Sequence, residues 1–129
     1  MKGSRVNLKD AFEKVTFLED RTPEHSLNGE GEDAFATLAD YRDGGVFIAH
    51  YEGKSKWERH PGDELVHVLE GQTTLFLLNG EEETPISLSA GELVVVPENV
   101  WHRFDTPSGV KVMTVTPQPT EHSIERPDN

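Results

Sequence analysis

The feature that most constrains this chain is a series of short β-prone stretches that runs from Gly45 to Val115. Turn residues separate the stretches, and successive stretches begin roughly 8–12 residues apart, a spacing typical of sandwiches and barrels. Asn79-Gly80 is a strong signal for a hairpin turn between two of them. The predicted strands are 46–51, 64–69, 73–78, 85–88, 93–96, 101–104 and 110–115. We therefore predict an all-β sandwich or barrel.

The segment before the first of these strands is less regular. It begins with a predicted short helix over 7–14, for which Asn7 is a suitable N-terminal cap. Residues 15–18 are β-prone, and 20–33 are polar and are expected to form a loop. Residues 34–41 fit a strand or one helical turn, and we favour the strand.

The length of 129 residues is that of one domain. Within it we distinguish residues 1–44, a helix and strands that pack on a barrel or on a dimer partner, from the barrel core at 45–116. Residues 117–129 contain three prolines and little apolar content, so we expect a flexible C-terminal tail.

Charge and composition exclude several classes of protein. The chain carries 24 acidic and 12 basic side chains, for a net charge of −12, which repels phosphate backbones and anionic lipids. We therefore expect no nucleic-acid partner and no membrane association. The absence of cysteine excludes disulfides and thiolate metal sites. No apolar run that could serve as a signal peptide follows the first residues, so we expect a cytoplasmic location.

One group of polar residues is the candidate site, and it begins with Glu58, His60 and Glu64. Pro61-Gly62 disfavours a continuous helix between the last two, so we predict a strand ending near His60 and a new strand starting at Glu64. Residues two apart on a strand share a face, which places Glu58 and His60 together.

The fourth candidate residue is His102, which shares a strand face with Phe104. If Phe104 points into the core, His102 does too, and the same logic buries Glu64 with Val66. A buried carboxylate needs a cation or a shifted pKa. A metal ion meets that need, and a hydrogen-bonded polar cluster without metal is the alternative.

Two segments resemble the sequence motifs of the cupin family. In the first, Glu64 and Gly71 have the family's spacing; in the second, Gly91, Pro97 and His102 do. The resemblance covers roughly residues 45–116 and is closest to small single-domain cupins of unassigned activity. The chain departs from the pattern at three positions, with Glu58 in place of the first metal-binding histidine, Asn99 in place of a turn glycine, and Gly53 one residue nearer the motif.

This resemblance implies a jelly-roll β-barrel that holds a divalent metal near its mouth. The ligands would be His60, Glu64 and His102, with Glu58 either a fourth ligand or an acceptor for an imidazole N–H. Two imidazoles and one carboxylate with open positions are typical of non-haem Fe(II) oxygen chemistry. Mn, Ni and Zn are the other candidate ions.

The resemblance leaves three functions open. The first is a metal-dependent enzyme, oxygenase-like or isomerase-like, that acts on a small molecule. The second is a non-catalytic module that binds a small ligand or a metal. The third is a metal-free barrel that acts as a dimeric interaction domain. We expect a homodimer, both from the resemblance and because small barrels often pair their exposed edges.

Overall fold

The computed structural model describes residues 3–27 and 29–128, and most of them lie in β-strands. The helical elements are α1 (Leu8–Glu13) and two 3-10 helices, η1 (Pro23–Leu27) and η2 (Glu32–Ala34). The strands are β1 (Leu18–Arg21), β2 (Phe35–Tyr41), β3 (Gly44–Lys54), β4 (Trp57–Arg59), β5 (Glu64–Asn79), β6 (Glu82–Ser89), β7 (Leu93–Val96), β8 (His102–Pro117) and β9 (Glu121–Ser123). In this described part, no helix has the length and apolarity that crossing a membrane requires.

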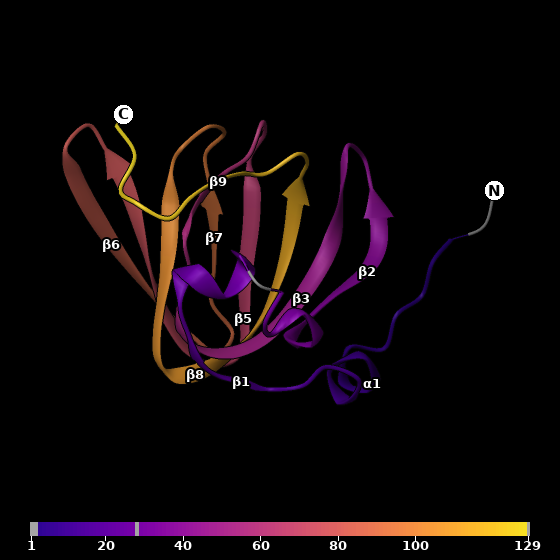
Figure 1. The fold of residues 1–129 in the computed structure, drawn as a ribbon. Coiled ribbons are helices and arrows are strands. Elements are labelled where there is room, and N and C mark those ends of the chain that lie inside the picture. The colour runs from indigo at the N-terminus through magenta and orange to yellow at the C-terminus, as the bar shows by residue number, and fades with distance from the viewer. Residues whose placement is uncertain (1–2, 28, 129) are drawn as a thin grey trace.

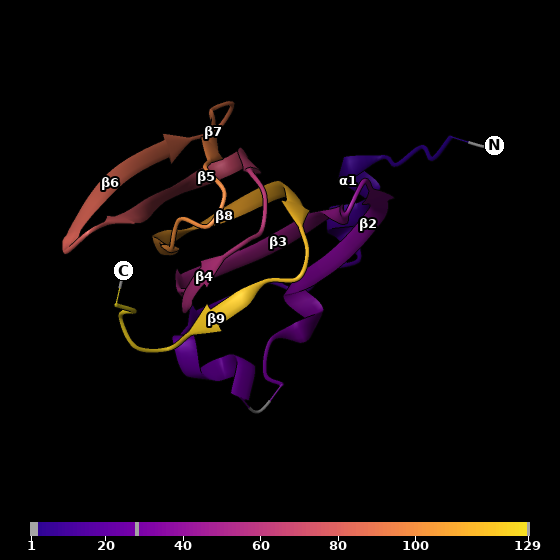
Figure 2. The same cartoon turned by 90° about the horizontal axis from the view of Figure 1, so that it is seen from above.

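The nine strands form one curved sheet (Figure 1). Three long strands, β3, β8 and β5, run side by side through its centre. β1 and β2 pair with β3, β6 and β7 pair with β5, and β4 lies between β8 and β9. Seen from above, β4 and β9 lie on the same side of the molecule (Figure 2). The described strands do not close into a complete barrel, but the architecture is the predicted jelly-roll type with a short N-terminal helix.

The predicted strand breaks at two glycines are wrong. Gly71 and Gly109 lie inside β5 and β8, each of which joins two of the predicted strands. Both glycines have positive φ, 79° and 95°, and register shifts occur beside Gly71 in the pairing of the two strands. A Cβ atom at Gly71 would collide with the carbonyl oxygen of Gly109. The glycines therefore allow bulges that bend long strands instead of ending them.

The core follows the period-two pattern of the long strands. Val66 and Val68 of β5 are fully buried, as predicted, and pack with Phe104 of β8. The full cluster comprises Ala49, Tyr51, Val66, Val68, Leu75, Leu88, Val96, Phe104, Val110 and Val112. Because these side chains alternate with exposed or half-buried ones, one face of the sheet is apolar and encloses the interior.

The N-terminal segment joins the same sheet. Asn7 caps α1 as predicted, because its side chain accepts a hydrogen bond of 3.0 Å from the Asp10 N–H. The next strand is displaced from the predicted 15–18 to β1, which runs parallel to β3 and places Arg21 beside Gly53. Gly53 has a φ of 116°, and a Cβ atom there would collide with the Arg21 backbone. The backbones of Arg21 and Gly53 therefore lie in close contact, and the Arg21 side chain lines the cavity inside the sheet.

The two segments expected to be irregular contain more structure than predicted. Two 3-10 helices occupy much of the polar segment 20–33. In the segment after Pro117, Glu121–Ser123 form β9, which pairs antiparallel with β4. A salt bridge of 2.9 Å between Arg59 and Glu121 joins these two strands. The C-terminal segment therefore covers one side of the sheet interior.

Candidate metal centre

Three strands bring the candidate ligands to one buried position. His60 follows the last residue of β4, Glu64 is the first residue of β5, and His102 is the first residue of β8. Their exposed fractions are 4%, 5% and 1%. The inward direction of Glu64 and His102 follows from the apolar residues that alternate with them, as the sequence predicted.

The distances among these side chains are those of a ligand set. His102 Nε2 lies 3.1 Å from Glu64 Oε1, and His60 Nε2 lies 3.3 Å from Glu64 Oε2. One ligand atom of each residue lies within 4.8 Å of those of the other two. Ligands at right angles around an ion, each at about 2.1 Å, are about 3 Å apart. The three donor atoms are therefore close enough to share one ion.

The far nitrogen of each imidazole is fixed by a hydrogen bond. His102 Nδ1 lies 2.9 Å from the Val100 carbonyl oxygen, which can only accept, so Nδ1 carries a proton. His60 Nδ1 lies 2.9 Å from Thr120 Oγ1, whose own proton is donated to Gln118. The bond to Thr120 orients the ring so that His60 Nε2 points towards Glu64.

His60 Nε2 is the buried atom that the protein side chains leave unsatisfied. Although it is near the Glu64 carboxylate, its geometry makes no hydrogen bond with any described residue. A buried polar atom without a partner costs free energy, so such atoms are rare in native proteins. A cation between this nitrogen and the nearby carboxylate would give both groups a partner. The donor set fits a divalent metal on this ground.

The Glu64 carboxylate is held in its ionised form. Thr116 donates a hydrogen bond of 2.6 Å to Glu64 Oε2. Burial alone would raise the pKa of Glu64, but the imidazoles of His102 and His60 outweigh it and lower that pKa to about 2. Burial would likewise lower the pKa of His102, but the hydrogen bond and charge of Glu64 raise it. Without an ion, a proton on His102 Nε2 balances the carboxylate.

Glu58 lies near these three residues but is not one of the group. It sits opposite His102 in the pairing of β4 with β8, is half-buried, and lines the same cavity as His60 and Glu64. Among the described side chains, the group whose donor atoms converge consists of His60, Glu64 and His102 alone. The structure thus brings three of the four predicted ligands together and places the fourth on the cavity wall.

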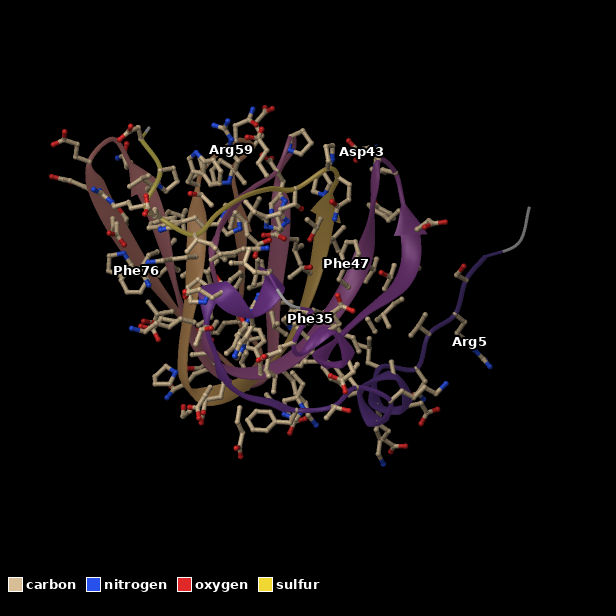
Figure 3. All side chains as sticks on the ribbon, viewed as in Figure 1. Arg5, Phe35, Asp43, Phe47, Arg59 and Phe76 are labelled. Atoms are coloured by element: carbon tan, nitrogen blue, oxygen red, sulfur yellow. The ribbon has the colours of Figure 1, made fainter. Side chains whose placement is uncertain are left out.

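A cavity of about 260 Å³ opens beside His60 and Glu64. One part of its wall is polar, with Glu58, Thr114 and Gln118 near the ligands. The rest is mainly apolar and comes from β2, β3 and β8, with one arginine from β1; these residues are Arg21, Phe35, Ala36, Phe47, Ile48, Ala49, Tyr51, Phe104 and Val112. Figure 3 shows Phe35 and Phe47 on the β2–β3 side of the molecule and Phe76 on the opposite side, over β6.

Comparison with known protein families identifies the fold. Residues 45–116, more than half of the chain, match the family model described as a cupin domain. The chain is a cupin. Its metal-ligand candidates therefore lie in a fold whose strands direct polar side chains into a β-lined interior.

Solved structures share the fold of this cupin at low sequence identity. A cupin-2 domain protein from Shewanella frigidimarina has a TM-score of 0.65 and 23% identity, and covers 88% of this chain and 94% of its own. Hydroquinone 1,2-dioxygenase from Sphingomonas sp. TTNP3, solved with 4-hydroxybenzoate bound, has a TM-score of 0.56 and 17% identity, and covers 70% of this chain and 67% of its own.

A curated relative of the cupin is acireductone dioxygenase of Rhodopseudomonas palustris strain TIE-1. It is 27% identical over 59 residues, which are 46% of this chain and 36% of the relative. The chain therefore matches little more than a third of that enzyme's length, and the match alone does not transfer its activity.

Three residues that line the site of this cupin were not predicted from the sequence. Thr116 has the same parity along β8 as His102, so the alternation that placed one could have placed the other. Thr120 and Arg21 lie in segments that showed no regular pattern, and nothing in the sequence identified them as neighbours of the site.

Proposed function

We propose that this cupin binds one divalent metal ion through His60, Glu64 and His102, and that it is a metal-dependent enzyme acting on a small molecule. The observation that carries this proposal is the orientation of the His60 imidazole. Its Nδ1 bonds to Thr120, and its buried Nε2 lies 3.3 Å from Glu64 Oε2 without a hydrogen-bond partner among the described residues. A cation held between this nitrogen and the carboxylate would satisfy both.

Two further observations support an oxygenase-like reaction. Two imidazoles and one carboxylate leave open positions on an ion, the pattern of non-haem Fe(II) oxygenases. A metal bound here would supply an electrophilic centre at which a small molecule and dioxygen can meet. Dioxygenases also occur among the proteins to which the chain is similar, in sequence and in fold. We therefore favour Fe(II), although Ni or Zn can occupy such a site when iron is scarce.

The protein residues would have distinct tasks in such a reaction. Thr116 and Thr120 orient the carboxylate and one imidazole, and Val100 orients the other through its carbonyl oxygen. The apolar wall of the cavity limits access of water to the reacting groups. We assign Glu58 to the cavity wall, where its charge acts on whatever binds beside the ion, and not to the direct ligands.

Elemental analysis of the purified protein tests the metal site. We expect about one equivalent of metal in the wild type and none in His60→Ala or His102→Ala, since each variant removes one of three ligands. His67→Ala is the matched control, because His67 lies on the opposite face of β5 and does not line the cavity. Metal that remains in both ligand variants would show that the ion binds elsewhere.

Oxygen uptake tests the reaction. Iron-loaded protein is to be screened with small phenols, enediols and keto acids in an oxygen electrode. Consumption that requires both iron and one of these compounds supports the enzyme. Full metal occupancy with no consumption across the panel would instead favour a non-catalytic binding module.

The expected homodimer and cytoplasmic location are part of this proposal. β6 and β7 each pair with β5 on one side, so their other sides offer free edges within the described sheet. Edge strands of this kind are often covered by a second copy. Light scattering after size exclusion should give twice the chain mass of 14.4 kDa.

A further inference from the structure

One cationic side chain in the cavity has no carboxylate partner. Arg21 is the only lysine or arginine among the described residues that line the cavity, and it forms no ion pair within 4 Å with any of them. By contrast, Arg59, Arg103 and Arg126 are each paired with a glutamate. In a chain with twice as many acidic as basic side chains, an arginine inside a cavity without an acidic partner needs an explanation.

The guanidinium group of Arg21 is held in place by two aromatic rings. Its central carbon lies 4.4 Å from the centre of the Tyr51 ring and 4.8 Å from that of Phe35. These two rings are stacked, with centres 6.1 Å apart. The backbone of Arg21 is fixed as well, because β1 is paired in parallel with β3 and approaches Gly53 closely. The charge is therefore oriented before any ligand arrives, which reduces the entropy lost on binding.

From this arrangement we propose that Arg21 binds the carboxylate of a small organic acid, whose body lies against the apolar cavity wall while its other end faces the metal ligands. This inference rests on the proposed metal site. No carboxylate of the described residues pairs with the positive charge of Arg21. A ligand with one negative charge would supply that partner. The planar fork of arginine pairs with a carboxylate through two parallel hydrogen bonds.

The volume and lining of the cavity limit the size of that acid. Cavities of roughly 150 Å³ hold benzene, and this one measures about 260 Å³. One ring or a short unsaturated chain with a carboxylate fits such a volume, whereas a nucleotide does not. Phe47, Phe104 and Val112 offer the apolar contacts that such a body needs.

Binding of benzoate and of its neutral analogue benzamide tests this proposal. The protein is loaded with Zn²⁺, its metal content is measured, and each probe is titrated by calorimetry or by ligand-observed NMR. We expect the wild type to prefer benzoate to benzamide. Arg21→Met, which keeps the apolar stem, should weaken benzoate binding about 10–100-fold and leave benzamide binding unchanged. The benzoate affinity of Arg21→Lys should lie between those of the wild type and Arg21→Met, because lysine keeps the charge but cannot form two parallel hydrogen bonds to a carboxylate.

Arg103→Met is the matched control, since Arg103 packs on Phe76 and lies outside the cavity lining. Its benzoate affinity should equal that of the wild type. Benzoate binding that is equal in the wild type and Arg21→Met would overturn the proposal, as would a wild type that binds neither probe or does not distinguish them. Circular dichroism of each variant checks that it is folded.

The same measurements separate this inference from the metal site. A wild type that holds its full metal content but does not prefer benzoate to benzamide contradicts the role of Arg21 alone. A protein that takes up no metal contradicts the proposed function, and the metal-free titration of wild type against Arg21→Met then decides the role of Arg21 by itself.

Discussion

The substitution Thr116→Val tests how far the Thr116 hydroxyl supports the Glu64 carboxylate, the proposed metal ligand. Thr116 is 5% exposed and donates a 2.6 Å hydrogen bond to Glu64 Oε2. Valine has the same shape, so the change removes the hydroxyl without opening a cavity. The oxygen that loses its donor then has His60 Nε2, 3.3 Å away, as its remaining neighbour in the group.

The size of the effect follows from the kind of hydrogen bond that is lost. A buried hydrogen bond to a charged group contributes about 1.5–3 kcal/mol. Since about 1.4 kcal/mol corresponds to a factor of ten, metal affinity should fall about 10–150-fold. The metal-free protein should also unfold several degrees lower, at roughly 3–5 °C per kcal/mol for a chain of this size. A competition titration with a chelating indicator measures the affinity, and a thermal melt in EDTA measures the stability.

Thr84→Val provides the control, because Thr84 is exposed on β6 and does not line the cavity. We expect it to have wild-type metal affinity and stability. If Thr116→Val binds metal as tightly as the wild type, the carboxylate does not depend on this hydroxyl, and the proposed orientation of Glu64 towards an ion is refuted.

Three further predictions concern titration, a bulge and the fourth candidate ligand. In the metal-free protein, burial lowers the pKa of His102, but Glu64 raises it, and the net result is a pKa above 6.5. The stability that the His102–Glu64 pair contributes is therefore present at pH 6.5 and is lost as the pH rises through the folded pKa of His102. It is also lost as the pH falls from 4.5 towards the Glu64 pKa of about 2, and thermal melts in EDTA across pH 2–9 measure both losses. Gly71→Ala should destabilise the protein by about 1–3 kcal/mol in urea titrations, and by more than Gly80→Ala, because both have positive φ but only the Cβ at 71 meets backbone. Glu58→Gln should keep one equivalent of metal with affinity changed less than about tenfold; loss of the metal would make Glu58 a ligand.

The sequence was most informative where apolar and polar residues alternate. Glu64 and His102 were predicted to be buried if Val66 and Phe104 face the core, and the structure buries all four. Alternation fixes which face a side chain occupies but not how far apart two strands lie. The meeting of these two residues therefore came from the resemblance to cupins, and not from the pattern.

Strand length could not be predicted in the same way. Gly71 follows one apolar stretch and precedes another, which is also the pattern of a turn. Whether a glycine ends a strand or forms a bulge depends on the strand that pairs with it. Here β8 runs past Gly71 and places Gly109 against it, and no local property of either glycine indicates this contact.

Two of the residues that no pattern revealed lie outside the range that the family model matches. The three metal-ligand candidates all lie within that range, 45–116. Arg21 comes from before this range and Thr120 from after it, yet both reach the same cavity. If the flanking segments determine ligand preference and the core binds the metal, Arg21→Met should change which acid binds without changing metal content. His102→Ala should abolish both metal content and ligand preference. Variants in which metal content and ligand preference always change together would contradict this division.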